Sequence, residues 1–319
     1  MKNSIIKKNV VRVAFGLVFG FVISFVAGSG VWAAGDDYVD DFNRYIFANG
    51  HAAIIEAGSE SGTTRVKCDK NDNGTFETSE TVSEGDLSKW SIFGGKKNGN
   101  VTNPKITMNS GDVFMIYAGG YACGGGFSNE SGFANVTGVA EITVNGGNIK
   151  YISGGSDAFY GNAVVNKSII TVNSGTVGSI YANYGGGQPA FNIDGNSYDG
   201  DINNVKDVSF KLLGGNIGGV LSTYPSSDDD YTYKITFEKV SSFIISGASV
   251  RGYDSNNGIP APTAADGTTK LYNVILYHEL NGSKYTNKKI QYVQLDDGTK
   301  YEYKNAYTSN SDGYICLGS

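Results

Sequence analysis

One phrase recurs through the middle of this chain, and it limits the fold more than any other feature. Three close copies and one looser copy read ITMNSGDVFMIYAGG from Ile106, ITVNGGNIKYISGG from Ile142, ITVNSGTVGSIYANYGGG from Ile170 and FKLLGGNIGGVLS from Phe210. Each copy encodes a strand, a corner and a strand, a unit too small to bury its own apolar side. We therefore expect the copies to stack and to bury their apolar sides against one another.

Aligning the copies on one glycine, here called the anchor, produces four apolar columns. The anchors are Gly111, Gly147, Gly175 and Gly215, with a degenerate fifth copy at Ala248. Apolar residues stand five and three places before each anchor, and two and five places after it. The first column consists of Ile106, Ile142, Ile170, Phe210 and Phe243. The two apolar positions before the anchor are two residues apart, so they share one side of a strand. The two after the anchor are three residues apart, which simple alternation cannot place on one side, so a second bend is predicted there.

An asparagine also recurs in the three close copies, two places before the anchor. These residues are Asn109, Asn145 and Asn173. Asparagine tolerates corner geometry and can join a ladder of side-chain amides. We interpret this column as structural.

The composition favours strands and turns. The chain contains 45 glycines but only 5 prolines among 319 residues, which excludes collagen. Hydrophobic residues make up 40%, enough to fill a core, so wholesale disorder is not expected. Abundant β-branched, aromatic and turn-forming residues predict an all-β fold of short strands.

The shared phrase ITVNGG-x-V-x-x-IY-x-GG resembles the glycine-rich β-helix repeats of bacterial secreted surface proteins, including the passenger domains of autotransporter adhesins. The likeness covers roughly residues 87–253. It implies a right-handed parallel β-helix, or solenoid, that binds an extracellular glycan or a host or envelope protein through loops or one flat face. One departure is that the segment after the repeats is too short for the membrane-inserted translocator of that family, so self-transport is not expected.

Residues 1–34 are typical of an export signal. A basic start precedes an apolar run from Val13 to Val26, a Gly-Ser-Gly break follows, and Ala33 and Ala34 offer cleavage points. The alternative is an uncleaved membrane anchor, because the apolar segment is almost long enough to span a bilayer. We expect cleavage, and a secreted or cell-surface location with no membrane contact beyond the export signal.

Four further segments are expected after the export signal. They are an N-terminal capping region at 35–86, the repeats at 87–257, a Pro/Gly/Ala linker at 258–267 and a small antiparallel β module at 268–319. Asn281-Gly282 and Asp297-Gly298 are hairpin signals within the last segment. The two terminal segments are expected to cover strand edges of the outermost copies, which would otherwise invite aggregation.

Charge and cysteine content exclude several partners. Removal of the export signal lowers the 25 Lys and Arg to 21 and leaves all 31 Asp and Glu. Such an acidic surface repels phosphate backbones, so nucleic acid is not an expected partner. The three cysteines, Cys68, Cys123 and Cys316, leave at least one thiol unpaired and have no zinc-site spacing.

One motif carries metal chemistry. Residues 69–80, DKNDNGTFETSE, fit the twelve-residue calcium pattern D-x-[DN]-x-[DN]-G-x5-E and resemble an EF-hand loop. The resemblance assigns calcium ligands, with an affinity of about 10⁻⁴–10⁻³ M, to Asp69, Asn71, Asn73, Thr75, Glu77 and Glu80. No framing helices are evident. The alternative is a polar hairpin turn at Asn73-Gly74 between strands at 65–68 and 75–78, with no cofactor.

Three rings each follow an isoleucine that is expected to point inward. They are Phe93, Tyr117 and Tyr181, and Ser153 interrupts their column. Because neighbours in a strand face opposite ways, the rings are expected to point outward, where they could stack on sugar faces or bind a partner protein. We favour the alternative, in which they only pack along the wall of the stack.

Catalytic groups are few. Asp199 with Asp201, and the acidic run at 228–230, could supply the paired carboxylates of a glycosidase, but a solvated loop is the better interpretation. No GxSxG or HExxH motif is present, and no arginine lies between Arg65 and Arg251 to serve as a lyase base. We favour a non-catalytic adhesin-like or structural protein, with a β-helix polysaccharide hydrolase or lyase as the alternative.

Overall fold

The computed structural model describes residues 38–124, 132–185, 202–223, 234–238 and 240–250, with strand segments at 191–193, 196–198 and between 274 and 308. Several predicted features lie outside the described residues: the export signal at 1–34, the acids at 199–201 and 228–230, the linker at 258–267, Tyr253 of the fifth copy and Cys316.

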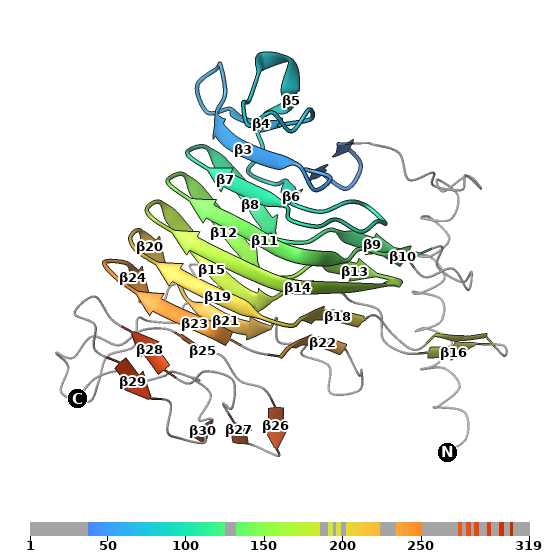
Figure 1. The fold of residues 1–319 in the computed structure, drawn as a ribbon, viewed down its shortest axis with the longest axis vertical. Coiled ribbons are helices and arrows are strands. Elements are labelled where there is room, and N and C mark those ends of the chain that lie inside the picture. The colour runs from blue at the N-terminus through green and yellow to red at the C-terminus, as the bar shows by residue number, and fades with distance from the viewer. Residues whose placement is uncertain are drawn as a thin grey trace, which may run out of the picture. The chain divides into compact units, whose positions relative to one another are not determined.

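The described chain is all-β, as the composition predicts. Apart from one 3-10 turn, η1 (Thr78–Glu80), every regular element in the described residues is a strand, and none of them is a helix that could cross a membrane. Most strands belong to two sheets, in which parallel pairing dominates (Figure 1). The parallel sheets are what stacked copies of one unit require.

The first sheet, sheet A, has ten strands and is parallel except at its first pair. Its strands are β1 (Val39–Asp40), β2 (Tyr45–Phe47), β6 (Ser91–Phe93), β8 (Asp112–Tyr117), β12 (Asn148–Ser153), β15 (Thr176–Asn183), β20 (Asn216–Ile217), β21 (Val220–Thr223), β24 (Ser249–Val250) and β25 (Val274–Ile275).

The second sheet, sheet B, has thirteen strands. They are β3 (Ala52–Ala57), β4 (Thr64–Cys68), β5 (Thr81–Gly85), β7 (Lys105–Met108), β10 (Gly132–Phe133), β11 (Val136–Val144), β14 (Gly161–Val172), β18 (Ile202–Val205), β19 (Val208–Leu212), β22 (Lys234–Phe237), β23 (Val240–Ile245), β28 (Tyr292–Gln294) and β29 (Lys300–Glu302). The antiparallel pairs are β3–β4, β4–β5 and β28–β29, at the two ends of the strand order.

Three small sheets complete the described strands. One pairs β9 (Tyr121–Cys123) with β13 (Asp157–Phe159) in parallel, and the other two are antiparallel. The antiparallel strands are β16 (Phe191–Ile193), β17 (Asn196–Tyr198), β26 (Glu279–Asn281), β27 (Lys284–Thr286) and β30 (Tyr307–Thr308). The antiparallel pairs β26–β27 and β28–β29 flank the two hairpin dipeptides in the sequence, as the dipeptides predict.

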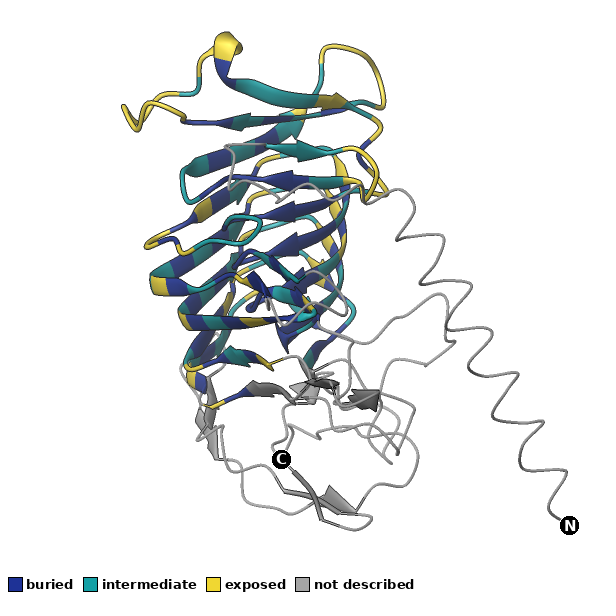
Figure 2. Ribbon diagram, turned by 90° about the vertical axis from the view of Figure 1, so that its right-hand side faces the viewer, coloured by how far each residue is buried: buried dark blue, intermediate teal, exposed yellow. Residues whose placement is uncertain are grey.

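The copies of the repeat pair in register, column by column. The chain passes from a strand of sheet B to a strand of sheet A within each copy, as the stacked arrows in Figure 1 show. Ile142 pairs with both Ile106 and Ile170, and Phe210 pairs with Ile170 and Phe243. These side chains are at most 1% exposed and belong to one continuous core (Figure 2). The predicted stacking of the copies is therefore confirmed.

The second half of each copy follows the same register in sheet A. Ile149 pairs with Val113 and Val177, and Ile152 pairs with Ile116 and Ile180. Both columns are buried although they stand three positions apart in the chain, so simple alternation breaks between them as expected. In the fourth copy this break divides the sheet A segment into two strands, β20 and β21. In the three earlier copies the segment stays one strand, which is β8, β12 or β15.

The anchor glycines form the corner between the two sheets. Gly111, Gly147, Gly175 and Gly215 all have φ between 85° and 96°, a region that suits glycine. In the fifth copy, alanine stands at the anchor, and the positive φ of 80° moves to the preceding Gly247. The predicted asparagine ladder is also present: Asn145 Nδ2 donates to Asn109 Oδ1 at 2.9 Å and Asn173 Nδ2 donates to Asn145 Oδ1 at 2.8 Å.

The register begins earlier than residue 87, where the sequence places the first repeat. Ala53 and Ile55 of β3 pair with Ile106 and Met108, which puts Gly58 at the anchor position of an additional copy. Ile46 of β2 and Ile92 of β6 continue the column of Ile116. In this first copy, residues 59–90 are inserted between the sheet B strand and the sheet A strand, and they include β4 and β5.

Candidate functional site

The motif loop at 69–80 is carried by the hairpin inserted in the first copy. It joins β4 to β5, which pair antiparallel and extend sheet B beyond β3. Val66 and Cys68 of β4 are completely buried, so one face of the hairpin belongs to the main core. The loop is therefore attached to a well-packed strand at its start.

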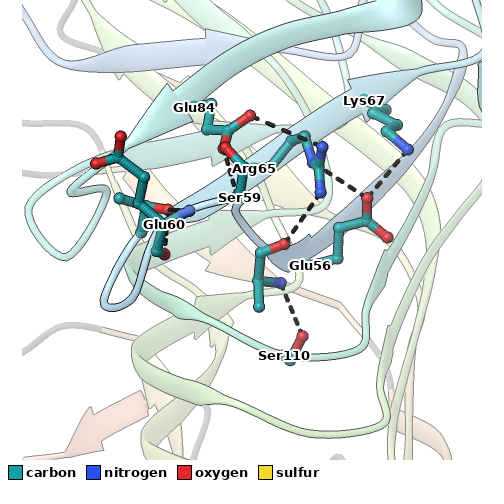
Figure 3. A network of polar contacts seen from close by, with 9 residues as sticks. Glu56, Ser59, Glu60, Arg65, Lys67, Glu84 and Ser110 are labelled. Carbon is teal, nitrogen blue, oxygen red and sulfur yellow. Dashed lines mark hydrogen bonds and ion pairs between the residues drawn. The ribbon is translucent and has the colours of Figure 1, made fainter. Parts of the chain in front are cut away.

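The opposite face of the hairpin carries a row of opposite charges (Figure 3). Arg65 lies between Glu56 and Glu84 in register, with N–O distances of 3.3 Å and 3.8 Å, and Lys67 Nζ is 3.0 Å from Glu56 Oε1. Hydrogen bonds from Ser59 hold the pKa of Glu84 below its usual value. Ion pairs that are still partly exposed stabilise little, but charges on the outermost strands of a sheet discourage edge-to-edge association.

Two acidic side chains close the loop at its ends. The Asp69 carboxylate accepts hydrogen bonds from the backbone N–H groups of Asn73 and Gly74 at 3.0 Å and 2.7 Å. The Glu80 carboxylate accepts from those of Lys70 and Glu77 at 2.9 Å and 3.1 Å. Both acids are less than 5% exposed. The first and twelfth positions of the motif are thus held inside the loop.

The intervening polar residues organise the turn. Asn71 Oδ1 accepts from the N–H of Asn73, and Asn73 Oδ1 accepts from the N–H of Thr75 at 2.8 Å. Asp72 and Gly74 have positive φ values of 55° and 81°. The alternative of a short hairpin with a second strand at 75–78 is wrong, because β5 begins only at Thr81 and the connection spans the whole motif.

The donor set fits calcium by chemistry. All six motif positions offer oxygen, which is what this hard cation prefers, and a carboxylate oxygen that accepts one N–H retains a further lone pair. Among the described residues no group of three or more His, Cys, Asp or Glu is gathered as a metal site, so the three motif carboxylates, Asp69, Glu77 and Glu80, do not form such a group in this structure. The residues that would hold the ion are the six that the motif assigns.

The loop is also fastened to the start of the described chain. His51 Nδ1 is 2.8 Å from Asp72 Oδ1, and the backbone N–H of Asp69 donates to the carbonyl of Ala52 at 2.9 Å. Lys70 Nζ lies 4.7 Å from the centre of the Tyr38 ring. Ordering of the loop is therefore linked to the corner between β2 and β3.

The favoured interpretation of the three rings, packing along the wall of the stack, is confirmed, and an exposed outward column is wrong. Phe93, Tyr117 and Tyr181 are 0%, 4% and 5% exposed. Alternation along the strand does turn them away from the main core, but a second cluster covers that face. Phe93 stacks on Tyr117 with ring centres 4.5 Å apart and on Phe47 at 5.1 Å. These rings pack the wall of the stack, and no sugar face can reach them.

Partly exposed rings form the outer layer over this column. They are Tyr45, Phe114, Tyr121, Tyr151 and Tyr184. The repeat phrase does not reveal them, because most stand at positions that its copies do not share. Tyr121 follows the two glycines after β8, whereas Tyr184 comes directly after β15 and before the glycines, so the copies differ at this corner.

Tyr184 fills the gap that Ser153 leaves in the column. Its ring centre lies 6.4 Å from that of Tyr117 and 4.9 Å from that of Tyr181. The Ser153 hydroxyl, which is completely buried, accepts from the N–H groups of Tyr184 and Gly155 at 3.0 Å each and donates to the Tyr184 carbonyl at 3.2 Å. The small side chain of Ser153 thus leaves space in the column and holds the backbone of Tyr184, whose ring fills that space.

Replacing Ser153 with alanine is expected to destabilise the protein by about 1–3 kcal/mol, because two buried N–H donors lose their acceptor. Ser179→Ala, on the neighbouring strand, is the matched control and should change the free energy of unfolding by less than about 0.5 kcal/mol. Urea denaturation followed by tyrosine fluorescence measures both. If both substitutions lowered the free energy of unfolding equally, the role assigned to the Ser153 hydroxyl would be contradicted.

The described cysteines offer no reactive group. Cys68 and Cys123 are both free thiols. Burial raises the pKa of Cys68 to about 12, and burial also raises that of Cys123. Because the thiolate is the nucleophile, both are inert near neutral pH.

Comparison with protein-family models, with curated proteins and with solved structures finds no match for this chain. Its function must therefore be argued from the described residues and their geometry.

Proposed function

We propose that this chain is an exported, non-catalytic right-handed parallel β-helix that acts as an adhesin-like or structural scaffold, secreted or at the cell surface. The observation that carries the proposal is the continuous parallel pairing of the copies from β3 to β23, which keeps their apolar columns in register. A stack built in this way presents long strand faces and corner loops on a rigid support, which suits binding and structural roles better than chemistry.

Cell fractionation with terminal sequencing tests export. The chain is expected outside the cytoplasm with a new amino terminus at residue 34 or 35. Deletion of the gene should then lower adhesion of the cells to glycan-coated or host-protein-coated surfaces, and re-expression should restore it. An uncleaved chain retained in the cytoplasm would contradict the proposal.

We also propose that the loop at 69–80 binds calcium and stiffens the inserted hairpin. The complete motif, its buried terminal acids and its twelve-residue length between β4 and β5 support this role. The hairpin covers the outer edge of β3, so a stiffer loop would protect the first strand edge of sheet B from pairing with another chain.

Calcium is therefore expected to raise the melting temperature relative to chelator. At 10 mM Ca²⁺ and a Kd of about 10⁻⁴–10⁻³ M, the stabilisation is about 1.4–2.7 kcal/mol. Glu80→Gln keeps only one of the two oxygens that accept from the N–H groups of Lys70 and Glu77, and it removes the charge and the second ligand oxygen, so it should abolish the shift. The control Glu84→Gln, on the exposed charged row, should retain it. An unchanged melting temperature of the native chain would refute the site.

A further inference from the structure

A polar group of side chains lies beside the aromatic wall, at the glycine-rich corner after sheet A. Lys97, Tyr121 and Asp157 are register partners on three neighbouring parallel segments, so their side chains lie on one side at a spacing of about 4.8 Å. All three are partly exposed. A sugar ring is about as long as this spacing, so the row matches successive units of an extended glycan.

The Tyr45 ring packs against Tyr121 of this group and against Phe93 of the wall. The Tyr45 ring centre lies 5.2 Å from that of Tyr121 and 5.1 Å from that of Phe93, both in edge-to-face geometry. Tyr45 keeps part of its surface exposed, whereas Phe93 is buried beneath it. Rings with an apolar face and a hydroxyl at the edge suit ligands that are apolar on one face and carry hydroxyl groups on the rim.

The carboxylate of Asp157 lies among the phenols. Burial, and after it the Asp157 charge, raises the pKa of Tyr45 and of Tyr117, and the same carboxylate contributes to the raised pKa of Tyr121. The phenols thus stay protonated and can donate hydrogen bonds, while the carboxylate can only accept them.

The charge of the group selects among glycans. Lys97 Nζ is paired with Asp40 Oδ2 at 2.9 Å. With Asp157, the group contains two carboxylates and one ammonium, so its net charge is negative. An acidic polysaccharide would be repelled, whereas a neutral one offers hydroxyl donors to the carboxylates.

We infer that Tyr45, Tyr121 and Asp157 form a binding site for a neutral glycan, which we call the tyrosine–aspartate site. The inference rests on the proposed function and names the ligand class of its scaffold. The tyrosines supply ring contact and hydroxyl donors, and Asp157 accepts hydrogen bonds from sugar hydroxyls.

Affinity electrophoresis of the purified full chain tests the site, with a soluble β-glucan, an α-mannan and a galactomannan as neutral probes and polygalacturonate as the acidic one. At least one neutral probe should retard the native protein, and polygalacturonate should not. Asp157→Asn and Tyr121→Phe should each weaken binding about tenfold, because each removes hydrogen-bonding capacity and leaves the shape unchanged. The control Glu60→Gln, at an exposed acid of the β3–β4 turn, should bind like the native protein.

Thermal melts show whether Asp157→Asn and Tyr121→Phe remain folded. Absence of retardation by all three neutral probes would overturn the inference, as would equal binding by native protein and both variants. Either result would leave the export, calcium and stacking tests unaffected, so failure of this site is distinguishable from failure of the proposed scaffold.

Discussion

Ile142→Asp is expected to abolish cooperative folding of the stack. Ile142 is 1% exposed and lies in the middle of its column, between Ile106 and Ile170. Truncating such a residue already costs about 2–5 kcal/mol, and a buried carboxylate without a partner adds several more, so the total reaches or exceeds the stability of an ordinary domain. Far-UV circular dichroism with urea titration measures the loss.

Thr143→Asp is the matched control for this substitution. Thr143 neighbours Ile142 on β11 but faces the other way and is partly exposed, so the same charge should cost less than about 1 kcal/mol there. If the two aspartates were equally tolerated, Ile142 would not lie inside a packed column and the register described above would be incorrect.

Gly175→Ala is expected to lower the free energy of unfolding by about 2–5 kcal/mol. Two penalties combine: φ is 96°, and an added Cβ would lie 2.8 Å from the carbonyl oxygen of Gly147 in the copy beneath it. Gly62→Ala is the control that separates the conformational penalty from the steric one. Gly62 also has a positive φ, of 79°, but an added Cβ there would meet no atom within 4 Å. The control should cost only the conformational part, about 1–2 kcal/mol. Equal losses would show that the close stacking of corners has no energetic weight.

The repeat phrase could predict the columns because its apolar positions are the ones that the core requires. It could not predict the first copy, since residues 59–90 separate Gly58 from the sheet A strand that contains Ile92. Register between distant segments depends on which strands pair in space, and spacing along the chain does not record an insertion of that length.

The aromatic wall shows how far alternation along a strand can be used. It correctly places Ile92 in the main core and Phe93 on the opposite side. It does not reveal what covers that side, because Tyr45 comes from β2 and Tyr121 from β9, on other parts of the fold. The tyrosine–aspartate site could not be predicted for the same reason: its members share no motif and meet only through pairing.

The calcium motif illustrates the opposite case. Its conformation depends mainly on bonds within twelve residues, such as those that Asp69 and Asn73 accept from nearby backbone N–H groups. Local chemistry of this kind is written in the sequence, so the length and closure of the loop could be predicted. The packing of Cys68 and the contact of Asp72 with His51 could not, because they depend on the surrounding fold.

A distance measurement across the stack tests the central claim most directly. Ile54 pairs with Thr107, and the register then passes through Thr143, Thr171 and Lys211 to Ile244. Five strand spacings separate the two ends, or about 24 Å between their backbones. Spin labels at Ile54 and Ile244, in a chain whose three native cysteines are replaced, should give one narrow distance distribution near that value by double electron–electron resonance. A broad distribution, or one centred beyond about 40 Å, would contradict the stacking of the copies.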